Sequence, residues 1–235
     1  MEETKSNHKG NKHVRKIKLR LEQPADYRKV EELTREAFWN HYVPGCNEHY
    51  LLHIMRDCGA FIRELDTVAE IDGEIVGNIV YTKGKILGDD GISREVLSFG
   101  PVSVLPALKA AGIGSALIEY TLARAKESGH GAVLIYGDPA YYQRFGFISA
   151  ETFGIGTADN MYAQPLQALE LREGTLRGCK GRFFEDAVYD IDEEAAAEFD
   201  KTFPDKELQD DLPSQERFRC LLGLRRPRGA GGGKE

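Results

Sequence analysis

Long hydrophobic runs are absent from this sequence, and two classes of protein are excluded with them. No segment approaches the roughly 18 consecutive apolar residues that a membrane-spanning helix needs. Residues 1–16, MEETKSNHKGNKHVRK, contain no apolar stretch of the kind that a secretory signal carries. We therefore expect a cytoplasmic protein that does not bind membranes.

Cysteine is also scarce. The sequence has four cysteines, Cys46, Cys58, Cys179 and Cys220, and no two of them form a CxxC pair. Structural zinc sites commonly use closely spaced pairs of this kind. The spacing therefore predicts no metal site, and we expect four free thiols in a chain without a secretory signal.

Net positive charge is missing except at the two ends. The whole chain carries −7, whereas residues 1–16 and 225–235 carry +3 each, so the region between them carries −13. An acidic body disfavours extended contact with the phosphates of nucleic acid, although the basic ends leave a weak form of that hypothesis open. We expect both ends to be disordered tails.

What the sequence does contain is typical of a globular domain with a sizeable core. Its 235 residues are 41% hydrophobic and 29% charged. Apolar periodicity and turn signals predict a series of alternating strands and helices. The predicted strands are 17–21, 68–71, 74–81, 96–105, 132–136, 161–171 and 182–191, and the predicted helices are 24–38, part of 39–60, 113–128 and a short one from 138.

Two glycines lie at a junction between a predicted strand, a loop and a helix. The loop reads Lys109-Ala-Ala-Gly112-Ile-Gly114. A helix N-terminus presents unpaired N–H groups, and glycine lets a phosphate approach the backbone closely. A Rossmann fingerprint would need a small residue where Leu117 stands, and a P-loop would need Gly-Lys-Ser/Thr. The loop therefore matches neither of these nucleotide-binding patterns.

The loop instead resembles the Q/R-x-x-G-x-G/A element of the GNAT acetyltransferases, with Lys109 in place of the usual glutamine or arginine. A second GNAT-like element follows in the same order: Tyr142-Gln-Arg-Phe145-Gly-Phe147 comes shortly after the predicted buried strand 132–136. The resemblance covers about residues 17–170. It implies an α/β (α+β) fold with a mixed, mostly antiparallel central sheet, a splayed pair of strands and flanking helices.

The resemblance also implies a domain organisation and a cosubstrate. We expect an acetyltransferase domain over 17–170, a C-terminal extension packed on it over 171–224, and a flexible tail over 225–235. The cosubstrate is expected to be acetyl-CoA, with no metal. The residues expected to hold it are Val102, Ser103, Val104, Lys109, Ala110, Gly112, Ile113, Gly114, Ser115, Asp138, Tyr141 and Phe145.

Acetyl transfer to an amine needs a base for the amine, stabilisation of the oxyanion and an acid for the departing thiolate. Tyr142 stands where the family places its tyrosine acid. Gly100-Pro101 marks an expected bulge, beside which the pantetheine arm would pair with the strand. The base is left open among Glu36, His41, His49 and Glu70.

The acceptor is expected to be a small-molecule amine or a peptide amino group. Segment 36–56 is expected on the acceptor side, with candidate lining residues Trp39, His41, Tyr42, His49, Tyr50 and His53. Residues 185–211 hold twelve Asp/Glu against two Lys. This charge would favour a cationic amine, but runs of charge are more often solvated surface, which is the favoured explanation here. Two further expectations are a possible homodimer and, as an alternative function, a non-catalytic acyl-CoA-binding module.

Overall fold

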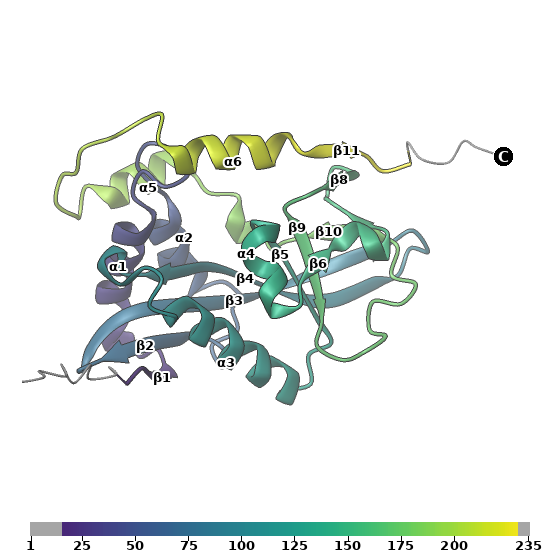
Figure 1. Cartoon of the computed structure of the whole chain (residues 1–235), viewed down its shortest axis with the longest axis horizontal. Helices are drawn as coiled ribbons and strands as arrows, with labels where there is room; N and C mark the ends of the chain where they lie inside the picture. The colour runs from purple at the N-terminus through teal and green to yellow at the C-terminus, as the bar shows by residue number, and fades with distance from the viewer. Residues whose placement is uncertain (1–15, 230–235) are drawn as a thin grey trace, which may run out of the picture.

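A computed structural model describes residues 16–229, and its main element is a nine-stranded sheet (Figure 1). The order along the sheet is β1-β2-β3-β4-β5-β9-β6, and β10 pairs with both β3 and β7. A separate two-stranded sheet joins β8 and β11. The strands are β1 (Lys18–Leu21), β2 (Thr67–Ile71), β3 (Glu74–Gly88), β4 (Ser93–Val104), β5 (Ala132–Tyr136), β6 (Ile148–Ser149), β7 (Ile155–Gly156), β8 (Met161–Ala163), β9 (Leu166–Glu170), β10 (Gly181–Phe184) and β11 (Arg225–Pro227).

Helices cover both faces of the sheet (Figure 1). Ile113 and Leu117 of α3 pack with Ile79 on one face, whereas Val30 of α1 and Leu52 of α2 pack with other strand residues on the opposite face. The α-helices are α1 (Tyr27–Phe38), α2 (Glu48–Met55), α3 (Ile113–Glu127), α4 (Pro139–Tyr142), α5 (Glu193–Asp200) and α6 (Pro213–Gly223). Short 3-10 helices are η1 (Pro24–Asp26), η2 (Pro106–Leu108), η3 (Gln143–Phe145), η4 (Ala150–Phe153) and η5 (Ala187–Tyr189).

The sheet opens between β4 and β5. These two parallel strands pair only at Leu97 and Val133, and beyond this point each runs on without the other. On its other edge β4 stays paired with β3 to Val104, but the register shifts opposite Gly100-Pro101. The expected bulge and the expected splayed strand pair are therefore both present, and the fold class predicted from the resemblance is confirmed.

Several predicted boundaries differ from the structure. Strand 74–81 continues to Gly88 as β3, and strand 161–171 is divided into β8 and β9. The strand predicted over 182–191 ends at Phe184, and η5 follows it. Arg225–Pro227, expected in a flexible tail, form β11 and pair with β8.

The two predicted tails lie mostly outside the described residues. Of the tail predicted over 1–16, the structure describes only Lys16. Of the tail predicted over 225–235, it describes residues 225–229. Within the described part of the chain, no helix is both long and apolar enough to cross a membrane. No cluster of metal-ligating side chains occurs among the same residues.

Candidate active site

The open edge of β4 forms one wall of the gap between β4 and β5. The Leu105 N–H donates to the Val76 carbonyl, 3.0 Å away, toward β3. Because N–H groups alternate in direction along a strand, those of Val102 and Val104 face the gap. The Ser103 side chain is buried on the α1 face, where its hydroxyl lies 2.8 Å from that of Thr34. The Ser103 side chain therefore cannot contact a ligand in the gap.

The loop before α3 presents backbone donors at the helix N-terminus. Gly112 caps α3 with φ 82°, and Ala110 has φ 64°, so the chain makes a tight left-handed turn there. The first N–H group of α3 with a backbone acceptor is that of Ala116, which donates to Gly112. Among the hydrogen bonds of residues 16–229, none uses the N–H groups of Ile113, Gly114 or Ser115. Three donors and the positive end of the helix dipole are thus available to an anion.

Side chains of this loop divide between core and surface. Ile113 is buried beneath the sheet, so only its backbone can contact a ligand. Lys109 is exposed, and its charge contributes to lowering the pKa of His41, although burial of the imidazole is the larger cause. The Lys109 and His41 side chains are therefore close enough for the charge of Lys109 to act on the imidazole.

Tyr142 stands at the end of α4 against the aromatic core of the gap. Its ring centroid lies 5.9 Å from that of Phe99 and 5.8 Å from that of Phe147. A Cβ atom at position 137 would overlap the Tyr142 ring, so Gly137 is needed for this packing. Burial raises the pKa of the Tyr142 hydroxyl, which therefore keeps its proton at neutral pH.

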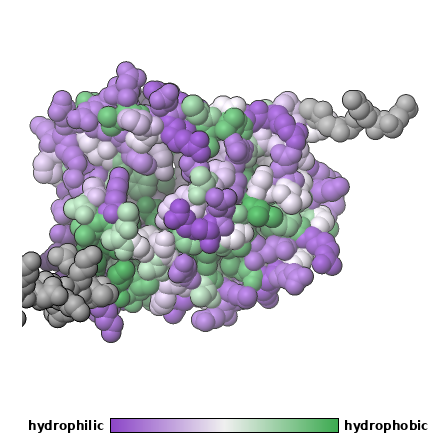
Figure 2. Space-filling model, in the orientation of Figure 1, coloured by the Kyte–Doolittle hydropathy of each residue, from purple (hydrophilic) through white to green (hydrophobic). Residues whose placement is uncertain are grey.

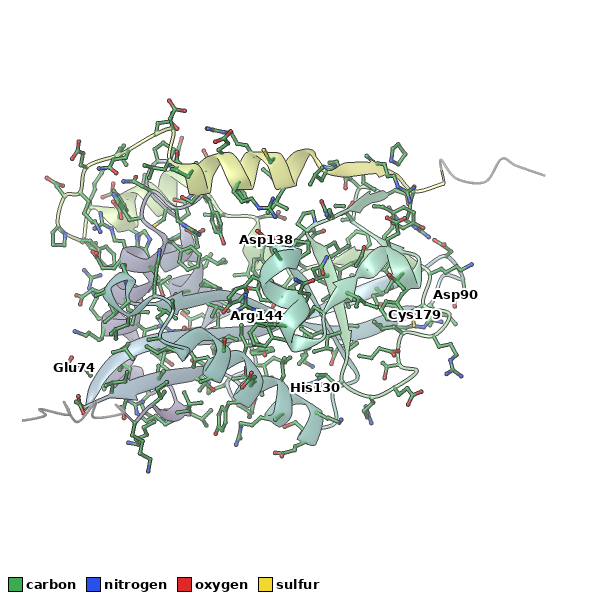
Figure 3. The ribbon with its side chains drawn as sticks, in the orientation of Figure 1. Glu74, Asp90, His130, Asp138, Arg144 and Cys179 are labelled. Atoms are coloured by element: carbon green, nitrogen blue, oxygen red, sulfur yellow. The ribbon has the colours of Figure 1, made fainter. Side chains whose placement is uncertain are left out.

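The neighbours of Tyr142 connect it to the loop and to the C-terminal extension. The Tyr141 hydroxyl lies near Gly114, and the Tyr141 and Phe145 rings pack together at 5.6 Å. The Asp138 carboxylate caps α4 by accepting from the Ala140 N–H, and it also pairs with Arg217 of α6 at 2.9 Å. Figure 3 shows Asp138 at the end of α4 that faces α6. Asp138 is therefore already engaged by two protein partners.

The visible face of the molecule is hollowed at this position. Figure 2 shows a recess below α6, between the α1 side and α4, with hydrophobic residues at its bottom. The recess corresponds to the opening between β4 and β5, beside which the aromatic side chains around Tyr142 pack.

Sequence comparison with known proteins identifies the family to which this arrangement belongs. The profile of the family described as "Acetyltransferase (GNAT) domain" matches residues 62–149. A protein of Escherichia coli K12, named "Uncharacterized N-acetyltransferase YhbS", is 27% identical over 129 residues, which span 55% of this chain and 72% of that protein. Residues 62–149 therefore form a GNAT acetyltransferase domain.

Solved structures support the same GNAT fold. A crystal structure of the E. coli GNAT family N-acetyltransferase YhbS in complex with CoA has a TM-score of 0.67 at 24% identity and covers 78% of this chain and 97% of that one. A GNAT family acetyltransferase from Brucella melitensis in complex with acetyl-CoA has a TM-score of 0.60 at 27% identity, over 74% of this chain and 99% of that one.

The carboxylates considered as bases for this GNAT enzyme are occupied elsewhere. Glu36 is exposed and pairs with Lys206 at 2.8 Å. Glu70 accepts from Arg20 and Lys18, which lower its pKa and make it a poor proton acceptor.

Of the two histidines, His49 is no better placed. His49 is fully buried beside Asp200, and desolvation lowers its pKa to about 4. Its other ring nitrogen lies 3.6 Å from the Cys46 sulfur. Burial raises the pKa of this thiol, so the Cys46–His49–Asp200 group holds α2 to α5 rather than forming a nucleophile. His41 keeps a lowered pKa, as described above.

Sequence reasoning did not single out Glu185 and Tyr189, which the structure places beside β4. They follow β10 in the C-terminal extension and lie beneath β4, with the Tyr189 hydroxyl donating to the Gly100 carbonyl at 3.2 Å. The Ser98 hydroxyl donates to Glu185 at 3.4 Å. The only sequence signal was that Glu185 begins the acidic stretch 185–211, which does not distinguish it from its eleven acidic neighbours.

Proposed function

We propose that this GNAT chain transfers the acetyl group of acetyl-CoA to a primary amine, with Tyr142 as the general acid. The observation that carries the proposal is the gap between β4 and β5. It has free backbone groups of Val102 and Val104 on one wall, the N-terminus of α3 at one end and the Tyr142 ring beside it. The CoA and acetyl-CoA complexes of the two relatives support this choice of cosubstrate.

Each part of the gap fits one part of acetyl-CoA. The N–H groups of Ile113, Gly114 and Ser115 suit the pyrophosphate, and Lys109 adds a positive charge. The N–H and carbonyl groups on the open edge of β4 suit the amides of the pantetheine arm, which would lie there as an added strand. The thioester would then lie near Tyr142, whose retained proton is available to the departing thiolate.

Binding of the cosubstrate is the first test. A calorimetric titration of the full chain with acetyl-CoA is expected to show saturable binding with one site per chain. Thiol release in the presence of a panel of primary amines then tests transfer. Binding without product from any amine would favour the alternative function, a non-catalytic acyl-CoA-binding module. No binding at millimolar acetyl-CoA would contradict both.

The contribution of Lys109 is expected to be modest. Because its side chain is exposed, its attraction to the phosphates is screened by solvent and salt. Lys109→Ala is expected to weaken acetyl-CoA binding about three- to tenfold, with a smaller effect at high salt. Lys126→Ala, at the opposite end of α3, is the matched control and should leave the dissociation constant unchanged. Equal effects of the two variants would exclude a local role for Lys109.

A further inference from the structure

Glu185 is a carboxylate that the fold places at the gap from outside the matched family region. It follows β10, whose Phe184 pairs with Lys85 of β3, and it precedes η5. Its Oε1 atom accepts from Ser98 at 3.4 Å. Ser98 comes directly after Leu97, the last residue of β4 that pairs with β5. Glu185 therefore lies where the two strands begin to separate.

Glu185 and Tyr142 reach this point from opposite faces of the sheet. Ser98 contacts Glu185, whereas the next residue, Phe99, packs against the Tyr142 ring. Successive side chains of a strand point to opposite faces. The acid proposed above and this carboxylate are consequently on the two sides of one opening, which is the arrangement that a reaction between two substrates meeting in the gap requires.

The surroundings of Glu185 contain polar groups but no basic residue that pairs with it. Tyr189 lies on its own segment and bonds to the Gly100 carbonyl and to Thr82 of β3. Burial raises the pKa of Tyr136 on β5, and the charge of Glu185 adds to this effect. The charge of Asp190 in turn adds to the effect of burial on the pKa of Glu185. Within the described residues, no ion pair involves Glu185, and the residue is half-buried.

Burial is the main reason that the pKa of Glu185 is raised, to about 7, and the nearby Asp190 adds to the effect. The Ser98 hydroxyl acts in the opposite direction by stabilising the carboxylate. A carboxylate whose pKa lies near neutral pH is a far better proton acceptor than an exposed one. The raised pKa and the position of Glu185 beside the gap therefore point in the same direction.

We propose that Glu185 is the general base for the acceptor amine, an inference that rests on the acetyl transfer proposed above. The amine nitrogen attacks the thioester carbonyl and forms the N–C bond, and its excess proton passes to the Glu185 carboxylate. The C–S bond then breaks with its electron pair on sulfur, and the thiolate takes the Tyr142 proton. Water returns a proton to Tyr142, and Glu185 releases its own proton to solvent.

The base assignment is tested with Glu185→Gln in the full chain. Thiol release from acetyl-CoA is followed with n-propylamine, spermidine and an alanine-initiated peptide as probe amines. We expect a loss of about 100-fold in kcat, within the range for removal of a general base, with unchanged acetyl-CoA affinity by calorimetry. Wild-type kcat/KM should fall more steeply than the neutral fraction of the amine as the pH drops through about 7, because Glu185 becomes protonated, and Glu185→Gln should lack this additional limb.

Two further variants separate catalysis from structure. Glu185→Asp keeps a carboxylate and should recover part of the lost activity together with the pH limb. Glu194→Gln makes the same chemical change at an exposed position of α5 and should behave as wild type. If the wild-type protein binds acetyl-CoA, any of three results would overturn the base assignment. These are unchanged turnover in Glu185→Gln, a pH limb that this variant retains, and no thiol release from wild type with any probe. Absence of acetyl-CoA binding would instead refute the proposed function.

Discussion

Replacing Tyr142 with phenylalanine is expected to lower kcat about a thousand-fold while leaving the acetyl-CoA dissociation constant nearly unchanged. The ring would keep its contacts with Phe99 and Phe147, so packing of the gap is preserved. What is lost is one hydroxyl whose pKa is raised by burial and which therefore carries a proton at neutral pH. Without it, the thiolate must leave unprotonated into a largely apolar environment.

Steady-state thiol release and calorimetry together measure this prediction. Tyr120→Phe, on the partly exposed side of α3, is the matched control and should retain full activity. A Tyr142→Phe variant with wild-type turnover would show that the proton comes from another group. A variant with weakened acetyl-CoA binding would instead indicate that the hydroxyl contributes to cosubstrate binding.

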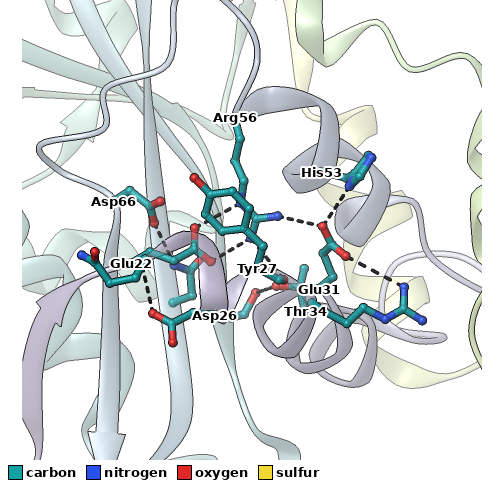
Figure 4. A network of polar contacts seen from close by, with 12 residues as sticks. Glu22, Asp26, Tyr27, Glu31, Thr34, His53, Arg56 and Asp66 are labelled. Atoms are coloured by element: carbon teal, nitrogen blue, oxygen red, sulfur yellow. Dashed lines mark hydrogen bonds and ion pairs between the residues drawn. The ribbon is translucent and has the colours of Figure 1, made fainter.

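The second large effect is expected on stability, at Arg56. This guanidinium is buried between α1 and the start of the sheet, and it pairs with Glu22 at 2.7 Å and with Glu31 at 2.8 Å (Figure 4). Burial and the neighbouring Glu22 raise the pKa of Asp66, so this third carboxyl favours its neutral form. The positive charge of Arg56 therefore compensates the negative charges of Glu22 and Glu31, whose carboxylates are almost completely buried.

Arg56→Met is expected to reduce the free energy of unfolding by about 3–5 kcal/mol, because both carboxylates lose their buried partner. Urea unfolding monitored by circular dichroism measures the change. Arg219→Met is the control, since Arg219 is exposed and its ion pairs with Asp210 and Asp211 are 3.6 Å or longer. Such surface pairs contribute about 0–1 kcal/mol. A loss at Arg56 no larger than at Arg219 would mean that the buried group relaxes or admits water.

Local sequence patterns predicted the elements that depend on local interactions. The apolar run at 132–136 is β5 with the same bounds, and the helix signal after Gly112 is α3. The second half of β3 was missed because Lys83 and Lys85 interrupt its apolar character, although both simply face solvent from a strand with buried neighbours. The extent of β10 could not be predicted, since it depends on a partner strand far away in the sequence.

The same distinction applies to the site. Tyr142 and the loop at Gly112 were found because each belongs to a short contiguous motif, and the structure places both at the gap. Their roles, like those of the other predicted site residues, stay predictions. Glu185 reaches Ser98 across 87 positions of sequence, and no motif surrounds it. A carboxylate brought into place by tertiary packing leaves no mark on local patterns.

The pairing of β10 with β3 has a consequence for the order in which the protein folds during its synthesis. Gly88 leaves the ribosome long before Gly181, its partner, so the corresponding edge of β3 is synthesised without its neighbour. Unpaired strand edges invite association with other chains while a protein is still folding. The segment that finally covers this edge is the one that carries Glu185 to the gap, so the nascent chain covers this edge of β3 and completes its proposed catalytic pair in the same late event.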